Sequence, residues 1–474
     1  MFVGRDKELS ALERRWSSQQ FECVVVYGRR RVGKTTLINR FLEDRPTIFF
    51  SAIESSASKN LESLSRSIAL YEKGSEAFET TPVYRSFESA LEAVFALAAK
   101  QRIAFVIDEY PYLAKADRTI NSVLQHAIDR HKDDSQLMMV LCGSSMSFME
   151  RQVLGYESPL YGRRTAQIKV EPFGYADVRK FLPRYSNEDA AIAYGLTDGI
   201  PQYLRQLDDG ISIRDNIRWN ILDPSCYLFE EPDNLLKQEL RSPAEYNAVI
   251  QAIASGASRS NTIATACHME SSSCATYLRN LIDLGIVRKE TPFGEDAPRK
   301  TIYRIEDSFF RFWYRYVPNN MSLIQSGHAD LAADRVMRTI SDFMGQVFED
   351  ICVQWIWSHN GTEALPFLML DAGRWWGANP TTRSQEEIDI VASGEQPKTL
   401  LFCECKWRSV PSGLQQLEVL RNRARLLPPR NQPLHAVLQI RLRRACRRPR
   451  GARRYSDACR FCGYGLVGSL HCGR

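Results

Sequence analysis

Short apolar runs rich in β-branched residues recur through the first 170 residues, and amphipathic stretches separate them. Runs of this length predict strands, and the stretches between them have the spacing of helices with one apolar face. Strands alternating with helices predict a parallel sheet covered by helices on both faces. The predicted strands are 22–27, 47–50, 103–107, 138–141 and 167–170, and the predicted helices include 35–43, 87–99 and 119–131.

After Pro172 the pattern becomes consecutive helices, and later the period of strands returns. Three helices at 242–254, 261–267 and 271–284, followed by strands at 286–289 and 301–304, predict a winged helix. A long helix at 340–357 and strands at 367–370, 388–392, 399–405 and 435–440 predict a second α/β domain. We therefore expect a core at 1–171, a helical lid at 172–235, a winged helix at 236–305, a helical linker at 306–340, an α/β domain at 341–440 and a tail at 441–474.

The composition is that of a globular protein, with 44% hydrophobic and 25% charged residues among 474. No apolar run approaches the roughly 18 residues of a transmembrane helix, and the first six residues lack the layout of a secretory signal. The scattered cysteines fit a reducing compartment. We therefore expect a soluble cytoplasmic protein with no membrane partner.

The net charge of +6 comes from the tail. Residues 441–474 hold ten arginines and one acidic residue, so the rest of the chain is slightly acidic. Cys459, Cys462, His471 and Cys472 offer zinc ligands, but their spacing is poor. Arginines without a single lysine, and the lack of an apolar period, favour instead an abnormal tail read in an altered frame, or a disordered one.

The loop Gly28-Arg29-Arg30-Arg31-Val32-Gly33-Lys34-Thr35 fits the pattern G-x-x-x-x-G-K-[ST] between a predicted strand and a predicted helix. The two glycines let backbone N–H groups surround phosphates. Lys34 reaches the β- and γ-phosphates, and Thr35 ligates Mg²⁺. We therefore predict that ATP binds to this loop and to Thr36.

Two more predicted strands end in polar side chains. The strand 103–107 ends in Asp108 and Glu109. We expect Asp108 to hold Mg²⁺ and Glu109 to orient the attacking water, which favours hydrolysis over binding alone. The strand 138–141 leads to Ser144 and Ser145, and either one of them contacts the γ-phosphate or the serines cap a helix.

Further segments accompany the loop: Phe2-Val3-Gly4-Arg5, Cys142-Gly-Ser-Ser145, Leu160-Tyr-Gly-Arg163-Arg164-Thr165 and Gly199-Ile-Pro201. Together they resemble the archaeal-type ATPase family, a branch of the AAA+/STAND P-loop NTPases, over roughly residues 1–235. The resemblance implies adenine packing near Val3–Arg5 and Pro201. It also implies that Arg163 or Arg164 responds to the γ-phosphate, in trans within a homo-oligomer; the alternative is a solvated basic pair.

Two segments of the middle of the chain remain ambiguous. A winged helix reads DNA with its third helix and its wing, but acidic neighbours partly offset the basic residues of this wing, so a packing role is the alternative. The aromatic stripe 309–316 contains Arg311 and Arg315. It either stacks on bases or forms the core of a docking helix, and we favour the core.

A second set of carboxylates lies near the C-terminus. In the strand 386–392 alternate residues share a face, so Glu387 and Asp389 point one way while Ile388 and Ile390 point into the core. Glu404 and Lys406 likewise share a face of the strand 399–405. If the two strands pair, Asp389 and Glu404 converge on one cation beside Lys406, and Glu349 on the preceding helix completes the metal site.

This arrangement, with Gly373-Arg-Trp-Trp-Gly377, resembles the PD-(D/E)XK nuclease superfamily as found in the domain that often follows archaeal-type ATPases. We therefore predict an α/β protein with a P-loop NTPase parallel sheet and helical lid, a winged-helix middle domain and a PD-(D/E)XK-like α/β C-terminal domain. The predicted function is an ATPase that controls a nuclease-like module acting on DNA. The alternatives are an ATP-dependent scaffold with an inactive C-terminal domain, and a P-loop kinase, for which no acceptor site is visible.

Overall fold

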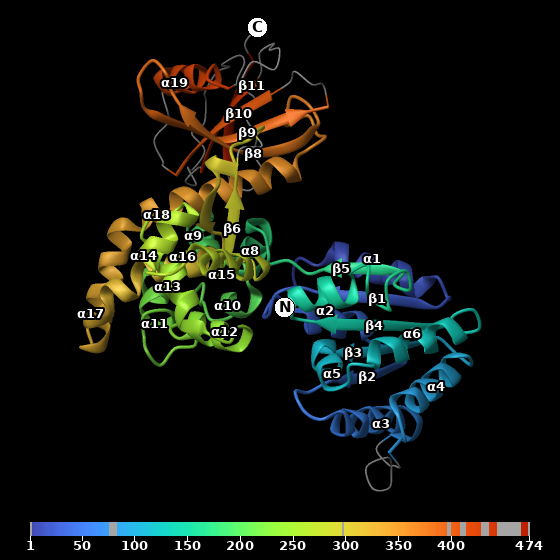
Figure 1. The fold of residues 1–474 in the computed structure, drawn as a ribbon. Helices are drawn as coiled ribbons and strands as arrows, with labels where there is room; N and C mark the ends of the chain where they lie inside the picture. The colour runs from blue at the N-terminus through green and yellow to red at the C-terminus, as the bar shows by residue number, and fades with distance from the viewer. Residues whose placement is uncertain are drawn as a thin grey trace. The chain divides into compact units, whose positions relative to one another are not determined.

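The computed structural model describes residues 2–74, 83–295, 298–395, 400–407, 414–427, 436–442 and 466–472. The chain divides into two compact units, Met1–Pro172 and Phe173–Arg474 (Figure 1). Among the described residues, no helix has both the length and the apolar character needed to cross a membrane.

The first unit is built on a parallel sheet. Its strands are β1 (Glu22–Tyr27), β2 (Thr47–Ser51), β3 (Ile103–Asp108), β4 (Leu137–Gly143) and β5 (Ala166–Lys169). Their order in the sheet is β2-β3-β4-β1-β5, and each pair of neighbours is parallel. The predicted parallel sheet is therefore confirmed, and every strand lies within two residues of its predicted bounds at each end.

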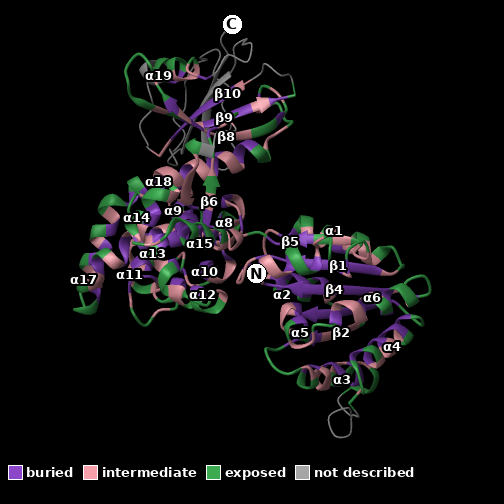
Figure 2. Ribbon diagram, in the orientation of Figure 1, coloured by how far each residue is buried: buried purple, intermediate pink, exposed green. Residues whose placement is uncertain are grey.

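Helices cover both faces of this sheet, and the mostly apolar strands β1, β3 and β4 are buried at every position (Figure 2). Val24 and Val26 of β1 pack on the side of α1 and α2, whereas Cys23 and Val25 pack on the side of α3 to α6. The helical segments are α1 (Asp6–Ser17), α2 (Lys34–Leu42), α3 (Ala57–Lys73), α4 (Phe87–Ala98), α5 (Tyr110–Ala116), α6 (Ile120–His131), α7 (Met146–Phe148) and the π-helix η2 (Met149–Val153).

The second unit begins with helices that share one hydrophobic core, which extends from Phe173 to Cys405. The helices are α8 (Tyr175–Phe181), α9 (Asn187–Thr197), α10 (Pro201–Leu204), α11 (Ile213–Asn220), α12 (Glu231–Glu239), α13 (Pro243–Ala254), α14 (Ser260–Ala266), α15 (Ser271–Asp283), α16 (Ser308–Tyr316), α17 (Met321–Gln325) and α18 (Ala329–Ser358), with short 3₁₀ turns η3 (Pro298–Lys300) and η4 (Pro318–Asn320). The domain boundary expected at residue 340 falls inside α18.

The aromatic stripe forms α16, and it lies at the centre of this core. Phe309, Phe310 and Phe312 have no exposed surface, and Tyr314 and Tyr316 are buried. Rings inside a core have no free face for a base. The interpretation as the core of a docking helix is therefore confirmed, and these five rings are too buried to stack on bases.

The three helices α13 to α15 are followed by a hairpin of β6 (Val287–Glu290) and β7 (Ile302–Ile305), as the winged-helix pattern predicts. The C-terminal sheet has the order β12-β11-β10-β9-β8. It is mixed, because β10 and β11 are parallel and the other neighbours are antiparallel. Its elements are β8 (Met369–Ala378), β9 (Gln385–Gly394), β10 (Leu400–Lys406), α19 (Leu414–Ala424), β11 (Ala436–Leu442) and β12 (Leu466–Cys472).

Two features of this sheet correct the sequence analysis. The helix α19 was not predicted, and it makes the crossover between the parallel strands β10 and β11. The tail also contains a strand, since β12 pairs with β11 from Leu442 and Leu466 to Ala436 and Cys472. The tail is therefore not disordered throughout, and backbone pairing rather than an apolar period orders residues 466–472. Cys459 and Cys462 lie outside the described residues.

Candidate functional site

The phosphate loop lies at the carboxyl-terminal edge of the first sheet, between β1 and α2. Gly33 is the N-cap of α2 and has a left-handed φ of 89°. Gly28 has a φ of 156°, and a Cβ there would lie 2.3 Å from the carbonyl oxygen of Val170. Gly28 is therefore required by the close approach of the strand end beside it, as well as by the curl of the loop.

The side chain of Lys34 is buried and lies back along the loop. Its Nζ donates to the carbonyl oxygens of Gly28 at 3.0 Å and Arg29 at 2.9 Å. Burial lowers the pKa of Lys34, while Asp108 and Glu109 act in the opposite direction. Arg5, which is also buried, donates from Nη2 to the Val32 carbonyl at 2.9 Å. The segment expected near the adenine thus lies against the phosphate loop.

The residues expected to hold Mg²⁺ lie together. Thr35 Oγ1 donates to Asp108 Oδ2 at 3.1 Å, and the Glu109 N–H donates to Asp108 Oδ1 at 3.0 Å. A hydroxyl and a carboxylate at the start of a phosphate-binding helix are oxygen donors of the kind Mg²⁺ prefers. These residues therefore fit the ion, which would supply positive charge for the phosphates of ATP.

Glu109 and Ser144 are joined across the ends of β3 and β4. Ser144 Oγ donates to Glu109 Oε2 at 3.0 Å and lies 3.3 Å from Oε1. Ser145 is the N-cap of α7, but its side chain makes no cap hydrogen bond. Neither serine therefore caps a helix through its side chain, which removes one of the two interpretations drawn from the sequence.

Arg163 and Arg164 lie at the opposite, amino-terminal edge of the same sheet. The next residue, Thr165, donates its N–H to the carbonyl of Cys23, near the start of β1. The phosphate loop follows the far end of β1, about 16 Å away at 3.3 Å per residue. Neither arginine reaches a γ-phosphate held by its own chain, so only the predicted contact in trans remains open.

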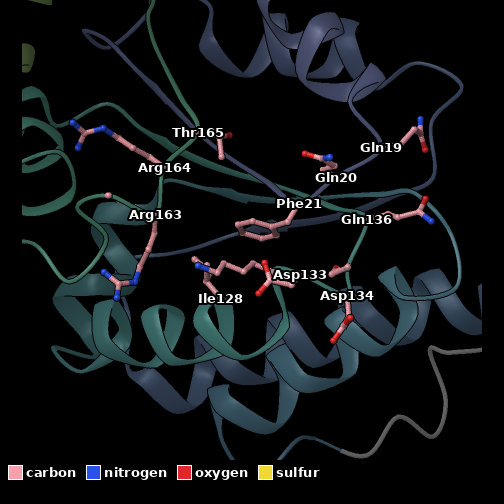
Figure 3. A pocket seen from close by; sticks show the side chains of 13 residues that line it. Gln19, Gln20, Phe21, Ile128, Asp133, Asp134, Gln136, Arg163, Arg164 and Thr165 are labelled. Carbon is pink, nitrogen blue, oxygen red and sulfur yellow. The ribbon is translucent and has the colours of Figure 1, made fainter.

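Both arginines line a pocket of about 610 Å³ at this edge (Figure 3). Arg163 makes a bidentate pair with Asp129, with Nε to Oδ1 at 2.9 Å and Nη2 to Oδ2 at 2.7 Å. Arg164 Nη1 donates to the Leu154 carbonyl at 2.8 Å, and its guanidinium lies over the Tyr161 ring. The interpretation as a freely solvated basic pair is wrong, because both side chains are bound within the unit.

Pro201 begins α10 in the second unit, and Asp198, which precedes it, binds α16. Asp198 Oδ1 accepts from the Ser308 N–H at 2.9 Å and from Ser308 Oγ at 3.1 Å. The expected adenine contact of Pro201 stays a prediction.

The second carboxylate set lies on β9, β10 and α18. Asp389 Oδ2 accepts from the Cys405 N–H at 2.7 Å. Trp375 of β8 pairs with Ile388, and Gly373 pairs with Val391. Asp389 and Ile390 together therefore oppose Arg374 alone, which is a β-bulge.

The bulge changes which side chains share a face. Ile388 packs with Trp375 in a small cluster of the C-terminal domain, whereas Ile390 belongs to the large core that includes α18. The expectation that Ile388 and Ile390 point into one core is wrong, because an extra residue in one strand breaks the alternation of faces. Bulges often re-aim a side chain next to a functional site, and here the re-aimed residue is Asp389.

Glu404 is held by two cations. Its Oε1 lies 2.5 Å from Lys406 Nζ, and its Oε2 lies 3.6 Å from Arg423 Nη1 on α19. Sequence analysis missed Arg423 because it did not predict α19. The charge of Glu404 also acts on Asp389, where burial first and Glu404 second raise the pKa to about 6.

Glu349 on α18 is the third carboxylate of the predicted set. Burial, and then the charge of Asp389, raise its pKa to about 7. Arg304 Nη2 lies 4.0 Å from its Oε2. The pKa values of Glu349 and Asp389 are thus raised by burial and by a neighbouring negative charge, a situation that a bound cation relieves.

The three carboxylates do not form an assembled three-ligand site. Within the described part of the chain, no group of three His, Cys, Asp or Glu side chains is arranged to hold a metal ion. The predicted set Glu349, Asp389 and Glu404 is corrected in this respect: Asp389 accepts from a backbone N–H, and Glu404 pairs with Lys406. Asp389 and Glu404 alone still fit Mg²⁺, which commonly binds one or two carboxylates and completes its shell with water and substrate phosphates.

The β6–β7 hairpin is docked on the C-terminal domain. The Phe293 N–H donates to the Arg374 carbonyl at 2.8 Å, directly opposite the bulge. Arg288 Nη1 lies 3.5 Å from Asp350 Oδ1 on α18. Two basic residues of the expected DNA-binding wing, Arg288 and Arg304, therefore face α18 in ion pairs instead of solvent.

Two family descriptions match the chain. Residues 2–207 match an ATPase domain found predominantly in Archaea, and residues 313–419 match a family of archaeal and bacterial proteins of unknown function. The first range contains the phosphate loop, Asp108, Glu109 and Ser144. The second contains Glu349, Asp389, Glu404 and Lys406.

The chain is also similar to individual proteins. An uncharacterised protein of Methanocaldococcus jannaschii is 33% identical over 411 residues, which are 86% of this chain and 88% of that protein. An uncharacterised ATP-binding protein of the same organism is 53% identical over 45 residues, 10% of this chain and 76% of that protein. The structure of a Walker-type ATPase of Pyrococcus abyssi has a TM-score of 0.50 at 21% identity, covering 66% of this chain and 96% of that chain. This last likeness concerns the fold.

Proposed function

We propose that this chain, which belongs to the archaeal ATPase family, uses ATP hydrolysis in its first unit to control a second unit that acts on DNA. Its family and its P-loop fold make it an ATPase. The observation that carries the proposed chemistry is the meeting of Lys34, Thr35, Asp108 and Glu109 at one sheet edge. What the hydrolysis controls is the further part of the proposal.

In the ATPase reaction, residues of the first unit have separate roles. Lys34, already oriented by two loop carbonyls, pairs with the β- and γ-phosphates. Thr35 and Asp108 would hold Mg²⁺, which would supply positive charge against the phosphates. Glu109 accepts a hydrogen bond from the attacking water and orients it. Glu109→Gln should therefore keep ATP affinity and slow hydrolysis.

We further propose that Arg164 reaches the nucleotide of a second copy of the chain. Arg163 is committed to Asp129 by two hydrogen bonds, whereas Arg164 is held by one carbonyl and one ring. Exchanging one neutral partner for a phosphate is therefore less costly for Arg164. Arg164→Ala should lower the hydrolysis rate without lowering ATP affinity, and mixing it with Glu109→Gln protein should restore part of the rate.

For the second unit we propose that Asp389 and Glu404 form a metal-dependent site that acts on DNA. Asp389 is a partly buried and Glu404 a buried carboxylate on paired strands, and Lys406 pairs with Glu404. The role of Lys406 is to stabilise charge on the phosphate under attack. The outer face of α15 suits DNA, since Ser272, Ser273 and Thr276 are small, polar and exposed, and Arg279 is exposed beside them.

The test is a cleavage assay on supercoiled and linear DNA with Mg²⁺ or Mn²⁺, with and without ATP. Wild-type protein should cut, and Asp389→Ala and Glu404→Ala should not, although both should hydrolyse ATP normally. Lys406→Ala should bind Mn²⁺ and cleave slowly. The matched control is Asp371→Ala, an exposed carboxylate on β8. Cleavage that persists in Asp389→Ala contradicts the proposed site.

One observation favours a second candidate, a scaffold with an inactive C-terminal domain. Glu404 already has two cationic partners, Lys406 and Arg423. If those pairs are permanent, no cation replaces them. Absence of cleavage by wild-type protein, together with no detectable Mn²⁺ binding, would support the scaffold.

A further inference from the structure

The β6–β7 hairpin carries two arginines side by side. Arg288 and Arg304 lie directly opposite each other in the antiparallel pairing of the two strands. Like charges in this position destabilise a hairpin unless carboxylates lie close to them. The hairpin itself supplies one carboxylate, Glu290, whose oxygens lie 2.5 Å from Arg288 Nε and 3.4 Å from Arg304 Nη1. One carboxylate between two guanidinium groups leaves this face of the hairpin with a net positive charge.

The other partners of the two arginines come from α18. Arg288 Nη1 lies 3.5 Å from Asp350 Oδ1, and Arg304 Nη2 lies 4.0 Å from Glu349 Oε2. Both distances are longer than the roughly 2.8 Å of a charge-assisted hydrogen bond. Burial lowers the pKa of Arg304, and the charges of Arg374 and Arg288 act in the same direction. The two arginines are thus held by contacts that a better-placed anion would replace.

The loop of the hairpin is docked on β8. The Phe293 N–H donates to the Arg374 carbonyl at 2.8 Å, and the Phe293 ring packs against the cluster that contains Trp375. A Cβ on Gly373 would lie 3.3 Å from Phe293 Cδ2, so glycine lets the ring approach the strand. The hairpin is therefore held at two places, by acidic residues of α18 near its base and by β8 at its loop.

We propose that the docked hairpin is autoinhibitory, because two acidic residues of α18 occupy the place that DNA phosphates would take on Arg288 and Arg304. DNA and the carboxylates of Glu349 and Asp350 then compete for the same guanidinium groups. A guanidinium binds phosphate through two parallel hydrogen bonds, which are shorter and stronger than the present contacts. DNA therefore has to release the hairpin from α18 before the hairpin contributes to binding. This inference rests on the proposed action of the second unit on DNA.

The experiment measures DNA binding by the full-length protein instead of cleavage. Fluorescence anisotropy with a short labelled duplex, in EDTA at about pH 8, follows binding without metal and above the pKa of about 7 of Glu349. Asp350→Asn and Glu349→Gln should each bind the duplex roughly 10-fold more tightly than wild-type protein. Gly373→Val should also bind more tightly, since its methyl groups displace Phe293 and weaken the docking of the hairpin without changing any charge.

The matched control is Asp342→Asn, which removes a carboxylate of the same helix that pairs with Arg315 instead of the hairpin. It should change the affinity for the duplex less than about 2-fold. The gain in Asp350→Asn should also depend on the hairpin arginines. In a background that carries Arg288→Gln and Arg304→Gln, Asp350→Asn should alter the affinity less than about 2-fold.

The possible results separate this inference from the proposed function. If wild-type protein binds the duplex and neither Asp350→Asn nor Gly373→Val strengthens the binding, the inference is overturned and the action on DNA stands. A gain that persists without the two arginines also overturns it, because the effect is then one of net charge. Gly373→Val keeps the contact of Asp350 with Arg311, so it decides the question should Asp350→Asn fail to fold. If no variant binds DNA, the proposed action on DNA fails and this inference fails with it.

Discussion

The two units both bury charged side chains at strand ends, but they hold those charges by different partners. In the first unit, backbone groups hold Lys34, which donates to two loop carbonyls, and one oxygen of Asp108, which accepts from a backbone N–H, while the Thr35 hydroxyl donates to the other oxygen. In the second unit most partners are other side chains, since Glu404 pairs with Lys406 and Glu349 pairs with Arg304. Backbone partners survive substitution of a neighbour. A side-chain partner is lost when that residue is substituted, so a single substitution should disturb more of its neighbours in the second unit than in the first.

The largest effect should follow loss of the cation in the phosphate loop. Lys34→Ala removes a charged donor whose backbone partners remain in place, so the loop should keep its shape and lose its phosphate contact. We expect ATP affinity to fall on the order of 100-fold, the value of a strong charge-assisted hydrogen bond. Titration with a fluorescent ATP analogue measures it. Lys169→Ala is the control, since Lys169 lies on β5 and pairs with Glu171. Equal affinity of both variants would contradict the assignment.

A large effect on the second unit should follow loss of the hairpin contact. Phe293 packs against the cluster of Trp375, Ile388 and Phe402, and its N–H binds the Arg374 carbonyl opposite the bulge. We expect Phe293→Ala to destabilise this unit by about 2 kcal/mol, less than a fully buried phenylalanine, because the ring is only partly buried. Urea unfolding followed by tryptophan fluorescence reports this unit, since seven of the eight tryptophans follow residue 172.

The control for this change lies on the same strand. Leu370 of β8 is 62% exposed, so Leu370→Ala should change the unfolding free energy by less than about 0.5 kcal/mol. ATP affinity should be unchanged in both variants. If Phe293→Ala is as stable as Leu370→Ala, the hairpin is not a structural part of the carboxylate region.

The sequence predicts the first site well for a physical reason. Lys34, Asp108 and Ser144 each follow a buried strand, and parallel strands place their carboxyl ends at one edge. The pairing of the strands then brings these residues together, and the phosphate-loop pattern identifies which loop residues bind the phosphates. What the sequence does not indicate is the Ser144–Glu109 bond, which depends on the left-handed turn at Glu109.

The second site is predicted less well because its geometry depends on contacts between distant segments. The strands β9 and β10 pair as expected, but the alternation of faces fails at Asp389, where β9 carries one residue more than β8. Nothing in the local pattern of β9 marks that bulge. Arg423 comes from α19, a helix with too weak an apolar period to be predicted, and the docking of Phe293 joins segments about 80 residues apart.

A moderate effect should appear in the pH dependence of the second unit. Burial and Asp389 raise the pKa of Glu349 to about 7, above its ordinary value of 4.5. The folded state therefore binds a proton that the unfolded state has released, so stability should fall as pH rises from 4.5 to 7. Glu349→Gln should flatten this fall, by at most about 1.4 kcal/mol per pH unit. Urea unfolding at several pH values measures it.

The control is Glu363→Gln, an exposed carboxylate near the end of the same long helix, which should keep the wild-type slope. Mn²⁺ should also flatten the slope of the wild-type protein, because a bound cation stabilises the ionised carboxylates. A slope that Glu349→Gln leaves unchanged would show that this group is not buried in its neutral form.

The smallest effect should follow removal of Arg311, a largely buried cation of the second unit. The side chain of Arg311 on α16 is 12% exposed, and burial lowers its pKa. Its Nη2 lies 3.7 Å from Asp350 Oδ2, and its Nε has no hydrogen-bond partner. A buried ion pair with incomplete hydrogen bonding contributes little, and an apolar residue of similar volume often replaces it without loss. Asp350 would keep Arg288 as a partner at 3.5 Å.

We therefore expect Arg311→Met to change the unfolding free energy of the second unit by less than about 1 kcal/mol, in urea titrations followed by tryptophan fluorescence. Lys34→Met, which removes a buried cation of the first unit, should leave stability similarly unaffected and lower ATP affinity on the order of 100-fold. A loss of 3 kcal/mol or more in Arg311→Met would mean that the charge itself orders the contact between α16 and α18, and the contrast between the two units would then be weaker than proposed.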